Sequence, residues 1–322
     1  MNIKQIISRR SYLEKCHALD IIYEWENVIS KEMSLSITSI SKIQRAYKRL
    51  HIFPTLLTTY KNSLYYVINA RDEELSINKK NIIPCIIDFF LKDEQLQHFY
   101  SIHSNNKLIL LSSPFDYEYL IEKKCPIPIA LMAYSLSDEY TLDNRTFNKK
   151  YDIVLTGRQD PLLYSFFKEY IKKHPEVTYV ERGKGDGNVK NLQYYINGTT
   201  LLGDIKTRKG YMDLLSQGRV SLYGTQGYVM DGITTGFYHV TPRFLEQVAC
   251  GCHILAHYPE CPDSKYYQLC DFSPSIESYE SFEYYMDRAI KTPVDISKYN
   301  EYLKKHYTST RVHELMNLLK TL

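Results

Sequence analysis

The segment Thr241–Leu255 (TPRFLEQVACGCHIL) combines charged groups with a helix start in a way that could hold a phosphorylated ligand. It is predicted to form a helix that opens after a Pro-Arg pair, carries Glu246 in its first turn and ends at Gly251. A short apolar run, Cys252–Ala256, follows at once and is predicted to be a buried strand. Because the first turn of a helix carries partial positive charge, a phosphate is expected at its start.

A second polar group, Gly157 and Arg158, lies between the apolar run Asp152–Leu155 and an amphipathic helix predicted at Leu162–Lys173. Glycine lets the backbone approach a ligand, and a guanidinium can pair with phosphate through two hydrogen bonds. The alternative is an ordinary strand-to-helix turn with a solvated arginine. In doubly wound sheets ligands bind beyond the carboxyl ends of the strands, so this turn, the loop after Tyr223 and the helix described above are expected to open onto one site.

The PRFLEQVACG run resembles a PR-F-E-x-x-A-C-G segment of bacterial glycosyltransferases of the spore maturation protein type, members of the GT-B superfamily. The similarity extends back through YMDLLSQGRVSLYG to DIVLTGR and forward to the final helix, so it covers most of residues 151 to 322. The resemblance implies an α/β fold with two Rossmann-like domains facing across a cleft and a C-terminal helix that crosses back to the first domain. It also implies transfer of a sugar from a nucleotide-diphosphate donor.

By this resemblance, Glu246 matches the acid that binds the ribose hydroxyls of the donor; the alternative is a first-turn glutamate favoured by the helix dipole. Many retaining members carry a second glutamate eight positions upstream, where this chain has Tyr238, which puts that retaining mechanism in doubt. Sugar and diphosphate contacts are therefore expected from Tyr238, Thr241 and Arg243. His239 is a further candidate, although a lone histidine is more often structural.

An inverting transfer would need a general base, which in this architecture comes from a loop of the first domain. Asp88 and Asp116 each follow an apolar run and are the catalytic candidates; a turn or cap role is the alternative for both. The first half contains no D-x-D string, so metal-independent transfer is predicted, with helix ends and arginines neutralising the leaving diphosphate. No cofactor beyond the nucleotide-sugar co-substrate is expected.

Two other polar groups invite weaker interpretations. The string ERGKGDGN, Glu181–Asn188, contains G-x-G-x-G but lies in a polar loop, so it is predicted to be a mobile loop and not a dinucleotide fingerprint. Lys206, Arg208 and Lys209 form a small basic group before a predicted helix, which would be either a solvated face or an edge of the cleft.

Composition indicates a globular protein of two domains, because 322 residues with 44% hydrophobic and 24% charged residues suffice for two cores. Residues 1–140 are predicted to form an acceptor domain, residues 141–300 a donor domain, and residues 301–322 a helix that packs back on the first. A net charge of +3 is too small to indicate a nucleic-acid partner.

Short apolar runs alternate with helical segments, the pattern of parallel sheets covered by helices on both faces. Strands are predicted at 64–69, 82–87, 107–112, 127–133, 152–155, 177–181, 220–223 and 252–256. Besides the helix around Glu246, helices are predicted at 8–32 with Tyr23, Trp25 and Val28 on an apolar stripe, at 41–50, 93–104, 162–173 and 209–217, and as a final pair separated near 308–310.

No run approaches the roughly 18 apolar residues of a membrane span, and the first twenty residues lack a signal-peptide core, so a cytoplasmic protein is predicted. Peripheral association with the inner face of the membrane is left open. Seven cysteines without paired spacing are typical of reduced structural thiols, and Cys250 and Cys252 lack the further ligands that zinc would need.

The expected activity is transfer of a sugar to a glycan or lipid-linked glycan acceptor in the synthesis of a surface polysaccharide, lipopolysaccharide or related glycan. Two alternatives remain open: a nucleotide-sugar epimerase or hydrolase of the same fold, and a non-catalytic protein that binds nucleotide-sugars or glycans. A nicotinamide-dependent dehydrogenase is disfavoured because the early glycine fingerprint is missing.

Overall fold

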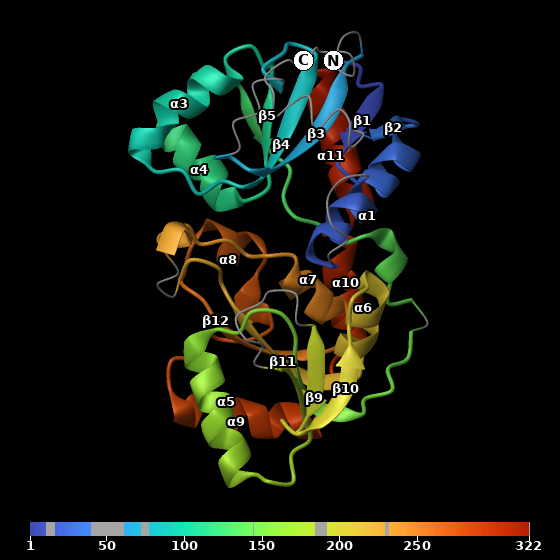
Figure 1. Cartoon of the computed structure of the whole chain (residues 1–322), viewed down its shortest axis with the longest axis vertical. Coiled ribbons are helices and arrows are strands. Elements are labelled where there is room, and N and C mark those ends of the chain that lie inside the picture. Colours follow the sequence, from blue (N-terminus) through green and yellow to red (C-terminus); the bar gives the residue numbers. More distant parts are fainter. Residues whose placement is uncertain are drawn as a thin grey trace. The chain divides into compact units, whose positions relative to one another are not determined.

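The computed structural model describes residues 1–10, 17–39, 61–71, 77–143, 145–183, 192–228 and 232–321. The chain forms two compact units: unit 1 holds Met1–Lys15, Leu19–Asp138 and His306–Leu322, and unit 2 holds Cys16–Ala18 and Glu139–Lys305. Each unit is built around one six-stranded sheet (Figure 1). The predicted helix at 41–50 and most of the predicted loop Glu181–Asn188 lie outside the described residues.

The sheet of unit 1 is parallel, with the strand order β2-β1-β3-β4-β5-β6. Its strands are β1 (Gln5–Ser8), β2 (Ser36–Ser39), β3 (Ser63–Asn69), β4 (Ile82–Asp88), β5 (Ile109–Leu111) and β6 (Ile129–Leu131). Its helices are α1 (His17–Glu32), α3 (Asp93–His103), α4 (Pro114–Glu122) and α11 (Thr308–Lys320). A 3₁₀ turn, η2 (Asp138–Tyr140), lies where the chain passes from unit 1 to unit 2.

Consecutive side chains of β3 lie on opposite faces of this sheet. Tyr65 belongs to the core that includes Phe89 and Phe99, which are T-shaped at 5.1 Å, whereas the ring of Tyr66 lies 6.0 Å from that of Trp25 in α1. Side chains alternate along a strand, so these contacts show that both faces are covered. In Figure 1, α3 and α4 accordingly lie on one side of the sheet and α1 and α11 on the other.

The N-terminal prediction needs two corrections. The helix expected from residue 8 is not formed there, because Gln5–Ser8 forms strand β1, whose four side chains are all buried; helix α1 covers His17–Glu32. On α1 the buried apolar stripe is formed by Ile22, Trp25 and Ile29, while the predicted stripe members Tyr23 and Val28 are only half-buried. Spacings of three and four residues place the observed stripe on one helix face.

The sheet of unit 2 has the order β10-β9-β8-β7-β11-β12, parallel from β8 to β12 and antiparallel at β9 and β10. Its strands are β7 (Tyr151–Leu155), β8 (Tyr179–Arg182), β9 (Gln193–Ile196), β10 (Thr200–Asp204), β11 (Gly218–Gly224) and β12 (His253–His257). Its helices are α5 (Pro161–Lys173), α6 (Arg208–Ser216), α7 (Arg243–Ala249), α8 (Pro262–Tyr266), α9 (Tyr279–Lys291) and α10 (Ile296–Lys304), with 3₁₀ turns η3 (Gly232–Thr234) and η4 (Leu269–Asp271).

Helices also cover both faces of this second sheet. Leu222 of β11 lies in a core with Phe167 of α5 and Phe282 of α9, whereas the neighbouring Tyr223 packs edge to face on Phe244 of α7 at 5.3 Å. Full burial of each such side chain contributes about 1.5–3 kcal/mol. The α/β prediction of two mainly parallel, Rossmann-like sheets is therefore confirmed.

The final pair of helices divides between the units. Helix α10 belongs to unit 2 and α11 to unit 1, so a C-terminal helix returns to the first unit as expected; the break falls after Lys304 and not at 308–310. Within unit 1, the Thr308 hydroxyl donates to the Leu136 carbonyl at 3.0 Å, and the Trp25 indole donates to the Ser135 carbonyl at 2.9 Å. These bonds fasten α11 and α1 to the segment that follows β6.

Candidate functional site

Three parallel strands of unit 2 end at the same edge of its sheet: β7 at Leu155, β11 at Gly224 and β12 at His257. The turn after β7 contains Gly157 in the left-handed region, at a φ of 68°. A Cβ atom on this glycine would lie 3.1 Å from Nη1 of Arg243. Both the backbone conformation and this close approach favour glycine, and they bring two predicted site residues together.

Arg243, the first residue of α7, is held against this turn. Its Nη1 donates to the carbonyl oxygens of Arg158 and Thr156, the latter at 3.4 Å, and its guanidinium lies 5.6 Å from the ring centre of Tyr223. Its Nε is buried and has no hydrogen-bond partner among the described residues. The Arg158 side chain is exposed, and the residue contacts Arg243 through its backbone carbonyl. A buried cationic donor is thus left at the carboxyl edge of the sheet.

Glu246 lies one turn further along α7 and is only 5% exposed. Its Oε1 accepts from Nη1 of Arg208 at 2.5 Å, and its Oε2 accepts from the Tyr211 hydroxyl at 2.7 Å. Burial, followed by the charge of Glu246, raises the pKa of Tyr211 well above its ordinary value, so Tyr211 remains a donor. Each carboxylate oxygen retains acceptor capacity, but any ribose contact would share Glu246 with these two partners.

Tyr194 of β9 adds to this group of residues. Its phenol is 1% exposed and is hydrogen-bonded to the backbone of Gly157. Burial raises the pKa of Tyr194, while the charges of Arg182 and Arg243 and the Gly157 hydrogen bond oppose that rise. Two guanidiniums from different elements therefore act on the Tyr194 phenol beside Gly157, and their field favours an anion there.

The remaining predicted donor residues differ in what they can offer. The backbone N–H of Thr241 donates to the hydroxyl of Tyr223 at 3.0 Å, which places Thr241 beside Arg243. Tyr238 is half-buried, with its ring 6.0 Å from that of Tyr228. His239 is fully buried and presents no surface to a ligand.

The sequence interpretation missed a histidine held between two carboxylates at this edge. Nδ1 of His257 lies 3.0 Å from Oδ2 of Asp160, and its Nε2 lies 3.3 Å from Glu277. Burial opposes protonation of His257, but the Asp160 hydrogen bond and the two carboxylate charges outweigh it and raise its pKa. The other oxygen of Asp160 caps α5 by accepting from the Leu163 N–H at 3.0 Å. Only this cap is readable from the sequence, as an Asp-Pro pair before a helix.

The predicted general bases lie in unit 1, at the carboxyl edge of its own sheet. Asp88 is the last residue of β4 and is half-buried. Asp116 lies in the first turn of α4, is 1% exposed, and its N–H donates to the Ser113 hydroxyl that caps the helix. Asp116 therefore occupies the helix-start position that the cap alternative predicts. Asp88 is the more exposed of the two carboxylates.

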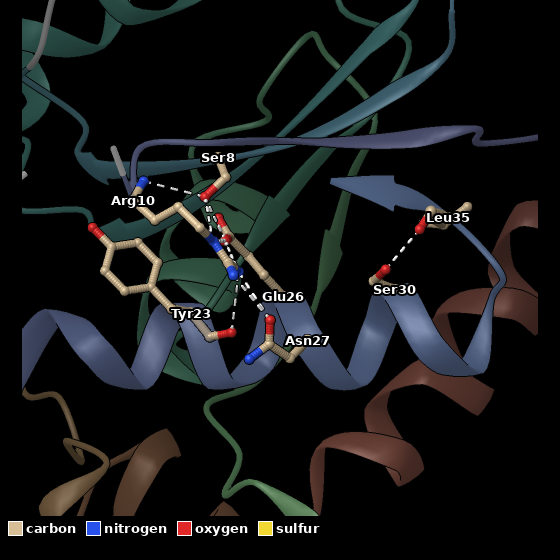
Figure 2. Close-up of polar contacts among 7 residues, drawn as sticks. All are labelled: Ser8, Arg10, Tyr23, Glu26, Asn27, Ser30 and Leu35. Carbon is tan, nitrogen blue, oxygen red and sulfur yellow. Dashed lines mark hydrogen bonds and ion pairs between the residues drawn. The ribbon is translucent and has the colours of Figure 1, made fainter. Parts of the chain in front are cut away.

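A partly buried ion pair at the end of β1 was also missed (Figure 2). Glu26 of α1 is 1% exposed, and its Oε2 accepts from the Ser8 hydroxyl at 2.6 Å and from Nη2 of Arg10 at 2.7 Å. Arg10 donates also to the side chain of Asn27 and to the backbone carbonyl of Tyr23. Burial raises the pKa of Glu26, while Ser8 and Arg10 oppose the rise. The cluster fastens α1 to the end of β1.

Metal and membrane features can be assessed only for the described part of the chain. Within it, no group of three His, Cys, Asp or Glu side chains could hold a metal ion, and no helix is long and apolar enough to cross a bilayer. Cys250 and Cys252 are fully buried, and their thiols face backbone carbonyl oxygens of α6. Burial raises the pKa of both thiols, which disfavours the thiolate that metal binding needs.

No protein-family description and no curated protein sequence matches the chain. Among solved structures, it is similar to AviGT4, a glycosyltransferase involved in avilamycin A biosynthesis, with a TM-score of 0.57 and 8% identity over 98% of this chain and 96% of that one. Weaker similarities are to a GtfA/B complex (TM-score 0.49, 10% identity, 87% of this chain and 59% of that one) and to an alpha1,3-fucosyltransferase (0.41, 11%, 94% and 89%). With two Rossmann-like units and a returning C-terminal helix, the chain has the GT-B type of fold.

Proposed function

We propose that the protein is a glycosyltransferase that moves a sugar from a nucleotide-diphosphate donor to an acceptor hydroxyl. One observation carries the proposal: Arg243 is held over Gly157 at the carboxyl edge of the second sheet with its buried Nε unpartnered among the described residues. A diphosphate oxygen would supply the acceptor that this N–H lacks, through a charge-assisted hydrogen bond. The fold shared with a known glycosyltransferase supports the same conclusion.

In this proposal Arg243 and Arg158 neutralise the diphosphate, and Gly157 lets it approach the backbone. Charge develops on the leaving diphosphate as the glycosidic bond breaks, so fixed guanidiniums at that position lower the barrier without any metal ion. The hydroxyl of Thr241 and the ring of Tyr238 complete the donor contacts. Because Tyr238 stands where many retaining relatives carry a glutamate, we favour an inverting transfer.

Glu246 has two tasks in the proposed complex. It anchors Arg208 and Tyr211, and its remaining lone pairs accept from the vicinal hydroxyls of the ribose. The ordering of this carboxylate before ligand binding reduces the entropic cost of holding the donor. A substitution here should therefore weaken both the packing of α6 on α7 and the affinity for the donor.

The acceptor is proposed to be a glycan or lipid-linked glycan of a surface polysaccharide or lipopolysaccharide pathway, bound by unit 1. Asp88 is the proposed general base, because it is half-buried at the carboxyl edge of that unit whereas Asp116 is enclosed. A base in this role removes the proton of the attacking hydroxyl. Replacing Asp88 with asparagine should abolish transfer while donor affinity is retained.

The direct test measures binding of nucleoside diphosphates and nucleotide-sugars by calorimetry to the wild type and to Arg243→Gln and Glu246→Gln. Arg243→Gln should weaken diphosphate binding about ten- to one-hundred-fold, the effect of one or two charge-assisted hydrogen bonds. Arg288→Gln is the matched control, since Arg288 lies exposed on α9 and stacks on Tyr284. Wild-type affinity in Arg243→Gln would overturn the proposal.

Turnover assays then separate the alternatives. Transfer to an acceptor supports the proposed activity, whereas consumption of donor without any acceptor would indicate an epimerase or hydrolase. Saturable donor binding with no turnover across a broad acceptor panel would indicate a binding protein.

A further inference from the structure

A cavity of about 320 Å³ lies at the opposite edge of the unit 2 sheet, where β7, β11 and β12 begin. Its walls come from the segment before β7, from the first residues of β11 and β12, and from the connection between α9 and α10. The lining residues are Arg145, Thr146, Phe147, Lys149, Arg219, Gly251, His253, Thr292, Pro293, Val294 and Ile296. The donor edge, by contrast, lies at the other ends of the same strands, about 13 Å away along β12 at 3.3 Å per residue.

The polar wall of this cavity is cationic. Arg145, Lys149 and Arg219 line it together with the half-buried His253, and the lining includes no Asp or Glu. Among the described residues, Arg219 forms a half-exposed ion pair with Asp152, whose Oδ1 lies 3.6 Å from its Nε. Lys149 donates to the carbonyl oxygens at positions 218 and 250, at 2.6 and 2.8 Å, which uses two of the three donors of its ammonium group.

These cations repel one another in a confined space. Burial lowers the pKa of Lys149, and the charges of Arg219 and Arg145 add to that effect, while the two nearby thiols oppose it. Like charges held together with no Asp or Glu among the lining residues raise the free energy of the folded unit, and the Arg219–Asp152 ion pair offsets only part of this. An anion bound among them would reverse the sign of that contribution, because each cation would then face an opposite charge.

The other wall is apolar, and Phe147 is its central side chain. Phe147 carries Arg145 and Lys149 near its ring at 5.3 and 4.8 Å, and a Cβ on Gly251 would lie 2.7 Å from a Phe147 ring carbon. Gly251 adopts a φ of 60°, so the chain end of α7 leaves room for this ring. Pro293, Val294 and Ile296 extend the apolar surface.

We propose that this cavity is a second ligand site, which binds a small phosphomonoester through Arg145, Lys149 and Arg219 and packs its apolar body on Phe147 and the α9–α10 connection. The volume is at the lower end of the range for small-molecule pockets, which favours a compact monoester over a nucleotide-sugar. Guanidiniums match phosphate oxygens in geometry as well as in charge. The site does not depend on the activity proposed for the opposite edge.

Calorimetric titration with phenyl phosphate tests this inference, with inorganic phosphate and benzyl alcohol as the two partial ligands. The wild type should bind one equivalent of phenyl phosphate at this site, inorganic phosphate more weakly, and benzyl alcohol not measurably. Arg145→Gln and Arg219→Gln should each weaken phenyl phosphate binding about ten-fold, since each removes a charged partner from the cavity. Asp152, the ion-pair partner of Arg219, keeps its hydrogen bonds from the N–H and hydroxyl of Thr178 in Arg219→Gln. Arg288→Gln, which removes an equivalent charge elsewhere on unit 2, should bind as the wild type does.

Arg243→Gln is the control for binding at the donor edge, and it should leave phenyl phosphate affinity within about two-fold of the wild type. Loss of binding in Arg243→Gln with full binding in Arg145→Gln and Arg219→Gln would place the anion at the donor edge and overturn the inference. Absence of saturable binding to the wild type would overturn it too. Equal affinity for phenyl phosphate and inorganic phosphate would refute the role of the apolar wall. Binding of benzyl alcohol as tight as that of phenyl phosphate would refute the role of the charged side chains.

Discussion

Substitution of Arg208 by methionine tests the central ion pair of unit 2. The side chains of Arg208 and Glu246 are only 8% and 7% exposed, and they form a hydrogen bond of 2.5 Å. Removing the guanidinium leaves a buried carboxylate that still accepts a hydrogen bond from the Tyr211 hydroxyl. Loss of one partner from a buried ion pair costs about 3–5 kcal/mol, because the other charge stays desolvated without compensation.

The expected change in thermal stability follows from that cost. For a unit of this size, 1 kcal/mol corresponds to about 2–4 °C in Tm, so Arg208→Met should lower the unit 2 transition by on the order of 10 °C. Differential scanning calorimetry resolves the transition, and the unit 1 transition should stay in place. The control is Lys209→Met on the same helix, whose ion pair with Asp213 is 84% and 51% exposed and should contribute no more than about 1 kcal/mol.

A double variant distinguishes the cost of an unpaired buried charge from the cost of losing side-chain packing. In Arg208→Met/Glu246→Leu no charge is left buried, so part of the lost stability should return, apart from the cost of an unsatisfied Tyr211 hydroxyl. If Arg208→Met shifted the transition by less than the Lys209→Met control, the desolvation reasoning for Glu246 would be wrong.

Three further predictions concern single side chains. His257 has a raised pKa, so it contributes stability that is fully present below its ordinary pKa of about 6.5 and is lost as pH rises through the raised value. His257→Gln should therefore flatten the fall of Tm as pH rises above about 6.5, and parallel Tm profiles of variant and wild type would contradict this. Gly157→Ala should cost about 1–2 kcal/mol from its left-handed backbone and, by displacing Arg243, should weaken diphosphate binding; an unchanged dissociation constant would speak against the site. Trp25→Phe should destabilise unit 1 by about 1–3 kcal/mol in urea unfolding, since it leaves a buried carbonyl without its donor, and an unaltered midpoint would show that this bond is not needed.

Much of the sheet core could be predicted from the sequence because parallel strands buried on both faces leave continuous apolar runs. The runs at 64–69, 82–87 and 152–155 correspond to β3, β4 and β7 within one residue at either end. Strand β1 was not predicted, because its four buried residues are flanked by lysine and arginine and the last of them was assigned to the same predicted helix as α1. Its burial depends on pairing with β3, which local periodicity does not reveal.

The β9–β10 hairpin was missed although its turn has a recognisable signature. Asn197 and Gly198 both adopt left-handed backbone, with φ values of 50° and 72°, and an Asn-Gly pair between short strands is a strong hairpin signal. The strands themselves are short, and β10 is exposed along most of its length, including Leu201 and Leu202, so it does not show the burial pattern of a core strand.

Site residues could be predicted only where a local motif marked them. Gly157 and Arg243 belong to such motifs, and the structure brings them together. The pairs His257–Asp160 and Arg208–Glu246 join residues 97 and 38 positions apart, and no short-range pattern encodes those contacts. The full burial of His239 likewise follows from tertiary packing that the sequence alone does not display.

The return of α11 to unit 1 bears on how the protein is made. Unit 1 is assembled from both ends of the chain, whereas nearly all of unit 2 comes from the single stretch Glu139–Lys305. A ribosome releases the chain in order, so unit 2 can acquire its structure first, while the parallel sheet of unit 1 must wait for α11 with its apolar surface unprotected. Synthesis that stops before Thr308 should therefore leave a folded second unit joined to an aggregation-prone first one.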